Sequence, residues 1–289
     1  MLLLDKPSGL TSNAAVQKVR RLFDRAKAGH TGTLDPLASG LLPICLGEAT
    51  KFSHPLLESS KTYRASLRLG WRSTTGDSEG ELSAVARPDF DEVQLRRAVG
   101  DLTGDIEQVP PMHSAIKLDG RPLYTLARKG ISVERAPRRV SIHEFEASRQ
   151  SEDTVEIFVR CSKGTYIRVL AEDLGERLGC GAYLTALRRV AIATIDVGQA
   201  VGLDALEQSP VAQRLALLRP IDALLASIPE VRLSMHDSTR LRHGLSIGGL
   251  DNLAPGPVRV YSERGEFLGL GEFGEDGLLK SRRLVSSAP

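Results

Sequence analysis

One carboxylate, Asp35, lies in a loop whose composition is unlike that of a core segment. The stretch GHTGTLDPLASG, residues 29–40, combines three glycines, one histidine and several hydroxyl side chains with a proline directly after Asp35. Glycines let a loop turn sharply, and a residue before proline favours extended backbone. The pattern indicates a carboxylate held in place as a nucleophile or base. Capping of a turn is an equally good interpretation of an Asp in a loop.

A second segment whose residues could take part in catalysis, SKGTYIR, contains Tyr166 and Arg168. A carboxylate nucleophile must be ionised, and in a pocket this requires a neighbouring cation. Arg168 could supply that cation. It lies two residues beyond Tyr166, so along a strand both side chains would face one side. A surface arginine and a core tyrosine form the competing interpretation.

His30 and Tyr63 are two further candidates. His30 precedes the Asp35 turn and could act as a general base or contact a nucleobase. Tyr63, in the segment KTYR, could be a stacking platform for a base. A structural loop histidine and an ordinary sheet tyrosine are the plainer interpretations.

These residues must be positioned by a chain in which helices and strands alternate irregularly. Apolar alternation and apolar runs predict strands, and a period near 3.6 predicts helices. Ser12 or Asn13 is the expected cap of the first helix. The irregular order favours an α+β fold with a largely antiparallel sheet. The expected strands are 41–47, 61–70, 138–150, 153–162 and one or two within 182–197. The expected helices are 14–26, a short one in 48–59, and 91–104. Residues 73–81 are expected to form a hairpin or loop, and residues 164–179 to turn from strand into helix.

Two parts of the chain differ from the rest in composition and residue pattern. Residues 114–139 carry seven basic and two acidic side chains, a net charge of +5, and suit an RNA-gripping element. A solvated charged face is the alternative. From about residue 231 the chain changes to short strands and glycine turns, which predicts a small all-β domain over 231–289 after a main domain of 1–230.

The bulk composition excludes several classes of protein. A net charge of +2 over 289 residues is too weak to indicate nucleic acid by itself. The three cysteines have neither zinc-site nor disulfide spacing, which suits a cytoplasmic protein with buried, inert thiols. A charged pair follows the first four residues, so no signal peptide is expected, and no apolar run could span a membrane. Because nucleotide-binding and metal-binding motifs are absent, neither cofactor nor metal is expected.

Five ordered blocks carry a family resemblance. They lie between residues 2 and 197: LLLDKPSGLTS, AGHTGTLDPLASGLLPICLGEATKF, KTYRASLRLG, DIEQVPPMHSAIKLDGRPLYTLARKG and CSKGTYIRVLAEDLG…LGCGAYLTALRR. Together they resemble the bacterial tRNA pseudouridine-55 synthase (TruB) family, and the ending GLLKSRRLV is also similar to that family's close. The resemblance implies a pseudouridine-synthase sheet flanked by helices, followed by a small PUA-like, β-rich RNA-binding domain at 231–289.

The resemblance also implies a reaction and a set of roles. The family isomerises a uridine of the tRNA T loop by flipping the base out, without cofactor or metal, and acts as a monomer on the T arm. Asp35 would be the nucleophile and Arg168 its partner. The implied roles of the remaining residues are stacking on the uracil for Tyr63, pocket lining for Tyr166 and Leu187, RNA contact for His30 and Lys117, and a mainly structural role for Lys6 and Pro7.

Isomerisation detaches uracil at N1 and rejoins it at C5, so the site must hold the freed base and exclude water. The residue pattern is compatible with attack of Asp35 on ring C6, with attack on sugar C1′, or with removal of a sugar proton. Two other functions fit the same residues. One is a catalytically idle protein that binds or folds tRNA, an activity that an active synthase could also have. The other is a nucleoside glycosidase, which usually needs two carboxylates.

Overall fold

One large mixed sheet forms the body of the molecule. The structure is a computed structural model that describes residues 1–118, 120–250 and 253–286. In this part of the chain the strand order is β14-β1-β3-β12-β4-β11-β10-β7, with β2 beside β3 and β13 beside β12. Only β1–β14 and β3–β12 pair in parallel among these described strands, so the expected largely antiparallel sheet is confirmed. The strands are β1 (Leu2–Lys6), β2 (Ala28–His30), β3 (Ser39–Leu46), β4 (Lys61–Leu69), β7 (Gly104–Gln108), β10 (Arg138–Arg149), β11 (Thr154–Cys161), β12 (Ala182–Ile192), β13 (Ile195–Asp196) and β14 (Val201–Gly202).

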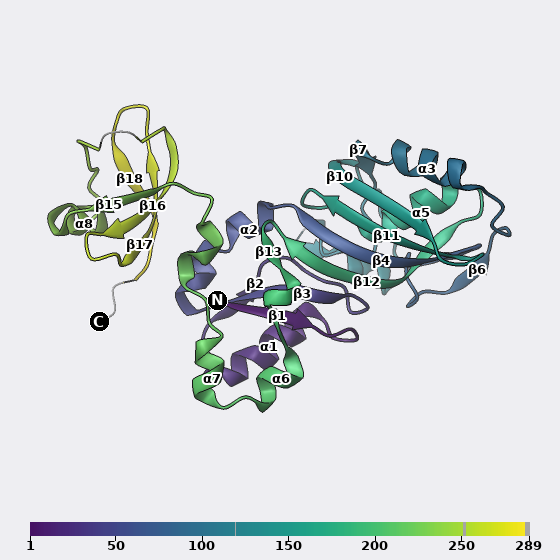
Figure 1. Cartoon of the computed structure of the whole chain (residues 1–289), viewed down its shortest axis with the longest axis horizontal. Coiled ribbons are helices and arrows are strands. Elements are labelled where there is room, and N and C mark those ends of the chain that lie inside the picture. Colours follow the sequence, from purple (N-terminus) through teal and green to yellow (C-terminus); the bar gives the residue numbers. More distant parts are fainter. Residues whose placement is uncertain (119, 251–252, 287–289) are drawn as a thin grey trace.

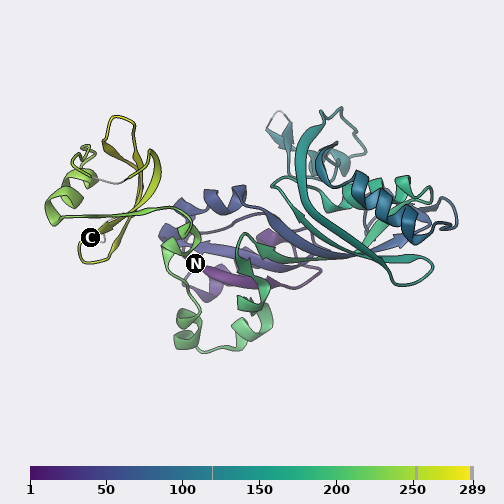
Figure 2. The same cartoon turned by 45° about the horizontal axis from the view of Figure 1, so that its top comes forward.

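Helices pack on both faces of this sheet: Leu2 and Leu4 of β1 join the main core, whereas Leu3 packs with Ala49 and Leu56 on the other face. Figure 2 shows α3 and α5 on the same side of strands β4, β10, β11 and β12. On β4, Ala65, Leu67 and Leu69 point into the resulting core, while Arg64 and Arg68 point outward, as a period of two requires. The helices of the body are α1 (Ser12–Leu22), η1 (Gly47–Phe52), α2 (His54–Glu58), α3 (Glu92–Asp101), α4 (Leu123–Ala127), α5 (Ile167–Arg177), η2 (Val197–Gln199), α6 (Leu203–Gln208), α7 (Val211–Ala216) and η3 (Ile221–Leu225).

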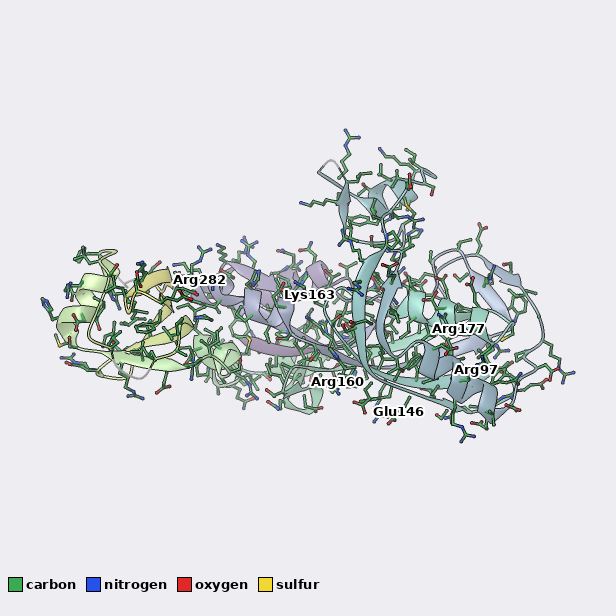
Figure 3. The ribbon with its side chains drawn as sticks, turned by 90° about the horizontal axis from the view of Figure 1, so that it is seen from above. Arg97, Glu146, Arg160, Lys163, Arg177 and Arg282 are labelled. Atoms are coloured by element: carbon green, nitrogen blue, oxygen red, sulfur yellow. The ribbon has the colours of Figure 1, made fainter. Side chains whose placement is uncertain are left out.

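The basic segment 114–139 is an insertion between β7 and β10. It holds a short hairpin, β8 (Lys117–Leu118) with β9 (Arg121–Pro122), followed by helix α4. This hairpin projects away from the sheet, on the side opposite to Glu146 and Arg160 (Figure 3). A second hairpin, β5 (Trp71–Ser73) with β6 (Leu82–Ala84), confirms the turn expected at 73–81. Residue 119 of the basic segment lies outside the described residues.

Two expectations about local elements are wrong. Helix α1 is capped by Thr11, whose side chain accepts a hydrogen bond from the N–H of Ala14, rather than by Ser12 or Asn13. The helix also ends at Leu22 instead of continuing to residue 26, because Asp24 and Arg25 adopt left-handed backbone. The segment 48–59 divides into a 3₁₀ turn, η1, and a short α-helix, α2.

The C-terminal part forms a separate four-stranded sheet with its own core (Figure 1). Its strands are β15 (Glu230–Leu233), β16 (Gly256–Ser262), β17 (Phe267–Phe273) and β18 (Leu279–Leu284). The expectation that this region is entirely β is wrong, because Ser234 caps a helix, α8 (Met235–Arg242). Residues 251–252 and 287–289 of the expected domain lie outside the described residues. The sheet meets the body where Phe267 packs edge-on against Phe52, with ring centroids 5.3 Å apart.

The three cysteines are buried, as expected. Burial raises the pKa of the Cys45 and Cys161 thiols to about 11, so both remain protonated at neutral pH. None of the described helices has the length and hydrophobicity that a membrane-spanning helix requires.

Candidate active site

The centre of the candidate site is an ion pair between Asp35 and Arg168. The Arg168 Nε lies 3.0 Å from the Asp35 Oδ2. This ion pair joins two segments that are 133 residues apart in sequence. The guanidinium donates its other hydrogen bonds to the carbonyl oxygens of Thr75 (2.9 Å) and His113 (2.8 Å). The Arg168 side chain is 5% exposed and that of Asp35 is 35% exposed. A fixed, buried cation therefore holds a carboxylate that still reaches solvent.

Tyr166 and Arg168 do not lie on a strand, which corrects the expected placement. Tyr166 is the N-cap of helix α5 and Arg168 is the second residue of that helix. Gln108, at the end of β7, holds both backbone groups of Tyr166 at the point where the helix begins. The Tyr166 N–H donates to the Gln108 Oε1 (3.0 Å), and the Gln108 Nε2 donates to the Tyr166 carbonyl (3.3 Å).

A second carboxylate, Asp77, approaches Arg168 from the β5–β6 hairpin. Its Oδ2 lies 3.7 Å from the Arg168 Nε, and its side chain is only 4% exposed. The Oδ1 accepts hydrogen bonds from the Thr75 hydroxyl (2.5 Å) and the Glu79 N–H (3.1 Å). Arg168 thus lies between a partly exposed carboxylate, Asp35, and a buried one, Asp77. Sequence reasoning missed Asp77, because an acid in a turn-rich stretch looks like any other turn residue.

Tyr63 is paired across the sheet with a buried arginine. On β4, Tyr63 lies opposite Arg189 of β12. Arg189 is 1% exposed and donates to the carbonyl oxygens of Leu41 (2.8 Å) and Gly32 (3.1 Å). Burial raises the pKa of the Tyr63 hydroxyl, and the Arg189 charge partly offsets this effect. Sequence reasoning also missed Arg189, which follows Leu187 in the segment ALRR without any distinguishing feature.

The other tyrosine, Tyr166, belongs to the same electrostatic neighbourhood. Burial is the main cause that raises the pKa of its hydroxyl, and the Asp35 carboxylate adds to this rise. The same carboxylate contributes in the same direction to the pKa of Tyr63. Both phenols are therefore neutral at physiological pH and near enough to Asp35 to respond to its charge.

The remaining predicted residues are placed differently. His30 ends β2, and burial together with the Arg189 charge lowers its pKa, so the imidazole is neutral. Its Nδ1 is buried and has no hydrogen-bond partner among the described residues. Leu187, on β12, is 8% exposed and packs in the main core. Lys117 stands apart from these residues, exposed on the β8–β9 hairpin.

Comparisons with known proteins place the chain in a family. Residues 20–167 match the model described as TruB family pseudouridylate synthase (N terminal domain). Residues 168–226 match the tRNA pseudouridylate synthase B C-terminal domain, and residues 229–285 match the C-terminal model of pseudouridine synthase II TruB. The chain belongs to the TruB family of pseudouridylate synthases.

Full-length relatives support the same TruB membership. The chain is 52% identical to the tRNA pseudouridine synthase B of Dechloromonas aromatica over 288 residues, which is 100% of this chain and 96% of that relative. It is 53% identical to the tRNA pseudouridine synthase B of Aromatoleum aromaticum, covering 99% of this chain and 92% of the relative.

Solved structures with low sequence identity share the TruB fold. A chain in a Cbf5–Nop10–Gar1 complex superimposes with a TM-score of 0.74 at 24% identity, covering 99% of this chain and 83% of that one. A chain in an H/ACA RNP bound to a substrate RNA containing 2′-deoxyuridine gives a TM-score of 0.73 at 22% identity, covering 98% and 84%.

Proposed function

We propose that this TruB-family chain isomerises uridine 55 in the T loop of tRNA to pseudouridine. The observation that carries the proposal is the Asp35–Arg168 ion pair, in which a buried guanidinium fixes a partly exposed carboxylate. Relatives that are about half identical over the full chain bear the name tRNA pseudouridine synthase B. The intact pair favours an active enzyme over a catalytically idle RNA-binding protein.

The proposed roles are those that the family resemblance implies for each side chain. Asp35 acts on the sugar or the ring as nucleophile or base. Tyr63 stacks on the uracil, while Tyr166 and Leu187 line the slot, and neutral His30 contacts the RNA around the flipped base. In the net reaction the N1–C1′ bond breaks and a C5–C1′ bond forms. The C5 proton leaves to solvent and N1 becomes protonated, so the reaction balances without cofactor or metal.

The proposed partner is the T arm of tRNA. Flipping a base out of its stack costs a few kcal/mol, and stacking on an aromatic side chain returns about 1–3 kcal/mol. The exposed cations of the 114–139 insertion, Lys117 among them, would hold the stem phosphates. We assign catalysis to residues 1–230 and further RNA binding to the PUA-like domain 231–289, in a monomeric cytoplasmic protein.

A nucleoside glycosidase is less well supported. Such enzymes place two carboxylates on either side of one bond. The second carboxylate near Asp35 is Asp77, but Asp77 is sealed from solvent and directed at Arg168. It can orient the guanidinium, whereas it cannot reach a substrate.

Tritium release tests the proposal. A tRNA transcript labelled with tritium at C5 of uridine should lose label to water with the wild-type chain, at one uridine per molecule. A transcript with cytidine at position 55 is the control and should lose none. Hydrolysis of the glycosidic bond or binding alone would release no tritium, so retention of the label would refute the isomerase.

A further inference from the structure

The turn that precedes helix α1 holds the loop that carries Asp35 through hydrogen bonds. The Ser12 hydroxyl accepts a hydrogen bond from the Leu34 N–H at 2.8 Å and donates one to the Leu34 carbonyl at 2.9 Å. Two residues further along the loop, the Pro36 carbonyl accepts a hydrogen bond from the Gly9 N–H at 2.7 Å. Both chain neighbours of Asp35 are therefore tied to one short segment, residues 9–12.

The hydrogen bonds between Ser12 and Leu34 are not needed to cap helix α1. The N-cap of α1 is Thr11, whose side chain satisfies the Ala14 N–H. Ser12 is 2% exposed, and its hydroxyl serves both backbone groups of Leu34, the residue directly before Asp35. A buried hydroxyl with two well-formed hydrogen bonds holds its partner rigidly, because breaking either bond would strand a buried polar group.

The segment 9–12 is itself held in place by a buried lysine. Lys6, which is fully buried, donates from Nζ to the carbonyl oxygens of Pro7 (2.8 Å), just before this segment, and Leu10 (2.6 Å), within it. The loop has one internal bond, from the Ala38 N–H to the Asp35 carbonyl (3.1 Å). Motion of Asp35 relative to the sheet is thus opposed at its backbone by this turn and at its carboxylate by Arg168.

We infer that Ser12 is a positioning residue for the reaction, because it fixes the main chain on which the Asp35 carboxylate is carried. This inference rests on the proposed isomerase function. Because its side chain is buried behind the loop, Ser12 should affect the rate of the bound complex and leave tRNA affinity unchanged. Displacement of a reacting group by about 1 Å can lower a rate about 100-fold.

Single-turnover tritium release with saturating enzyme tests the inference, together with tRNA binding on filters. Ser12→Ala should lower the maximal rate about 10-fold to 100-fold, while the Kd for tRNA stays within about twofold. Ser12→Thr keeps a hydroxyl and should recover most of the rate. Thr11→Ala is the matched control, since it removes the neighbouring helix cap, lowers the melting temperature, and leaves both Leu34 bonds in place. Its maximal rate should equal that of wild type.

Several outcomes would overturn the inference. They are an unchanged maximal rate in Ser12→Ala, an equal loss of rate in Thr11→Ala, or a failure of Ser12→Thr to exceed Ser12→Ala. If Ser12→Ala does not fold, Ser12→Cys replaces it, because a thiol is a weaker donor and acceptor. A wild-type rate in Ser12→Cys would then count against the inference. An inactive wild-type chain would instead refute the proposed function, so the two failures are distinguishable.

Discussion

At the scale of single residues, Asp35 is set apart by its combination of fixed position and open carboxylate. Arg168 holds one carboxylate oxygen, yet about a third of the Asp35 side chain remains accessible. A capping aspartate would direct its carboxylate at backbone N–H groups, whereas Asp35 directs Oδ2 at a buried guanidinium. This geometry favours the catalytic interpretation over the turn-capping one.

Replacing Asp35 by asparagine should separate chemistry from binding. Asp35→Asn has nearly the same shape, so the loop should persist, but the amide is neither a nucleophile nor a base. We expect tritium release to disappear while the Kd for tRNA changes by less than about tenfold. Residual activity above a few per cent of wild type would remove Asp35 from the nucleophile role.

Arg168 should not tolerate even a conservative change. Its guanidinium reaches Asp35, Thr75 and His113 through three different nitrogens, a fork that an ammonium group cannot reproduce. Arg168→Lys should therefore lower the single-turnover rate at least tenfold. Because the charge is retained and the defect is positional, raising the pH from 6 to 9 should not restore the rate. Recovery at high pH would show that Arg168 acts through the protonation of its partners instead.

At the scale of elements, the β3–β12 pairing depends on one glycine. Gly40 has φ of 103°, and a Cβ there would lie 2.2 Å from the Arg189 carbonyl oxygen. Gly40→Ala should lower the free energy of unfolding by about 3 kcal/mol or more in urea denaturation. Gly29→Ala is the control, because among the described residues no atom beyond its two chain neighbours lies within 4 Å of the added methyl group. Equal effects of the two substitutions would refute the close-approach argument.

Helix α5 carries an acid whose titration should be visible in stability. Burial, reinforced by the Asp173 charge, raises the pKa of Glu172 from 4.5 to about 7. Between these values the unfolded chain ionises Glu172 and the folded chain does not, so this group costs stability as pH rises from 4.5 to 7. Glu172→Gln should match wild type near pH 4.5 and exceed it at pH 7.5, by about 2 kcal/mol.

Urea denaturation at the two pH values checks this expectation. Glu146→Gln, exposed on β10, serves as the control and should show no such gain. A stability difference for Glu172→Gln that does not change with pH would contradict the proposed cause.

At the scale of the whole molecule, the projecting insertion offers cations away from the ion pair. Lys117 and Arg121 are exposed on the β8–β9 hairpin, and Arg128 and Lys129 are exposed directly after helix α4. Phosphate contacts fix the position of a nucleic acid but do not select its bases. Their loss should therefore reduce affinity more than the rate of bound substrate.

Neutralising these four residues together should flatten the salt dependence of tRNA binding. Each lost phosphate contact lowers the slope of log K against log salt by about 0.7–0.9, so the quadruple variant should lose about 2–4 in slope. A matched control neutralises Arg96, Arg97, Arg160 and Arg177, which are exposed elsewhere on the body. An unchanged slope in the insertion variant would mean that the insertion is only a solvated face.

The sequence by itself determined most of the secondary structure and the residue types of the site, because both depend largely on local properties. Alternation along β4 identified its buried face, and the glycine-rich loop with Asp35 was unlike any core segment. The fold class, mixed and largely antiparallel, followed from the order of elements and is confirmed. Local patterns were misleading at Tyr166, which begins a helix rather than lying on a strand and whose backbone is held by the distant Gln108.

Only the tertiary structure decided which residues meet. Asp77 and Arg189 have no distinguishing neighbours in sequence, yet one faces Arg168 and the other lies across the sheet from Tyr63. Ser12 looked like a helix cap, whereas its hydroxyl holds Leu34, 22 residues away. The physical reason is that side-chain periodicity records which face of an element is buried, but not which distant segment covers it. Hydrogen bonds and ion pairs between distant segments form only once the sheet has brought those segments together.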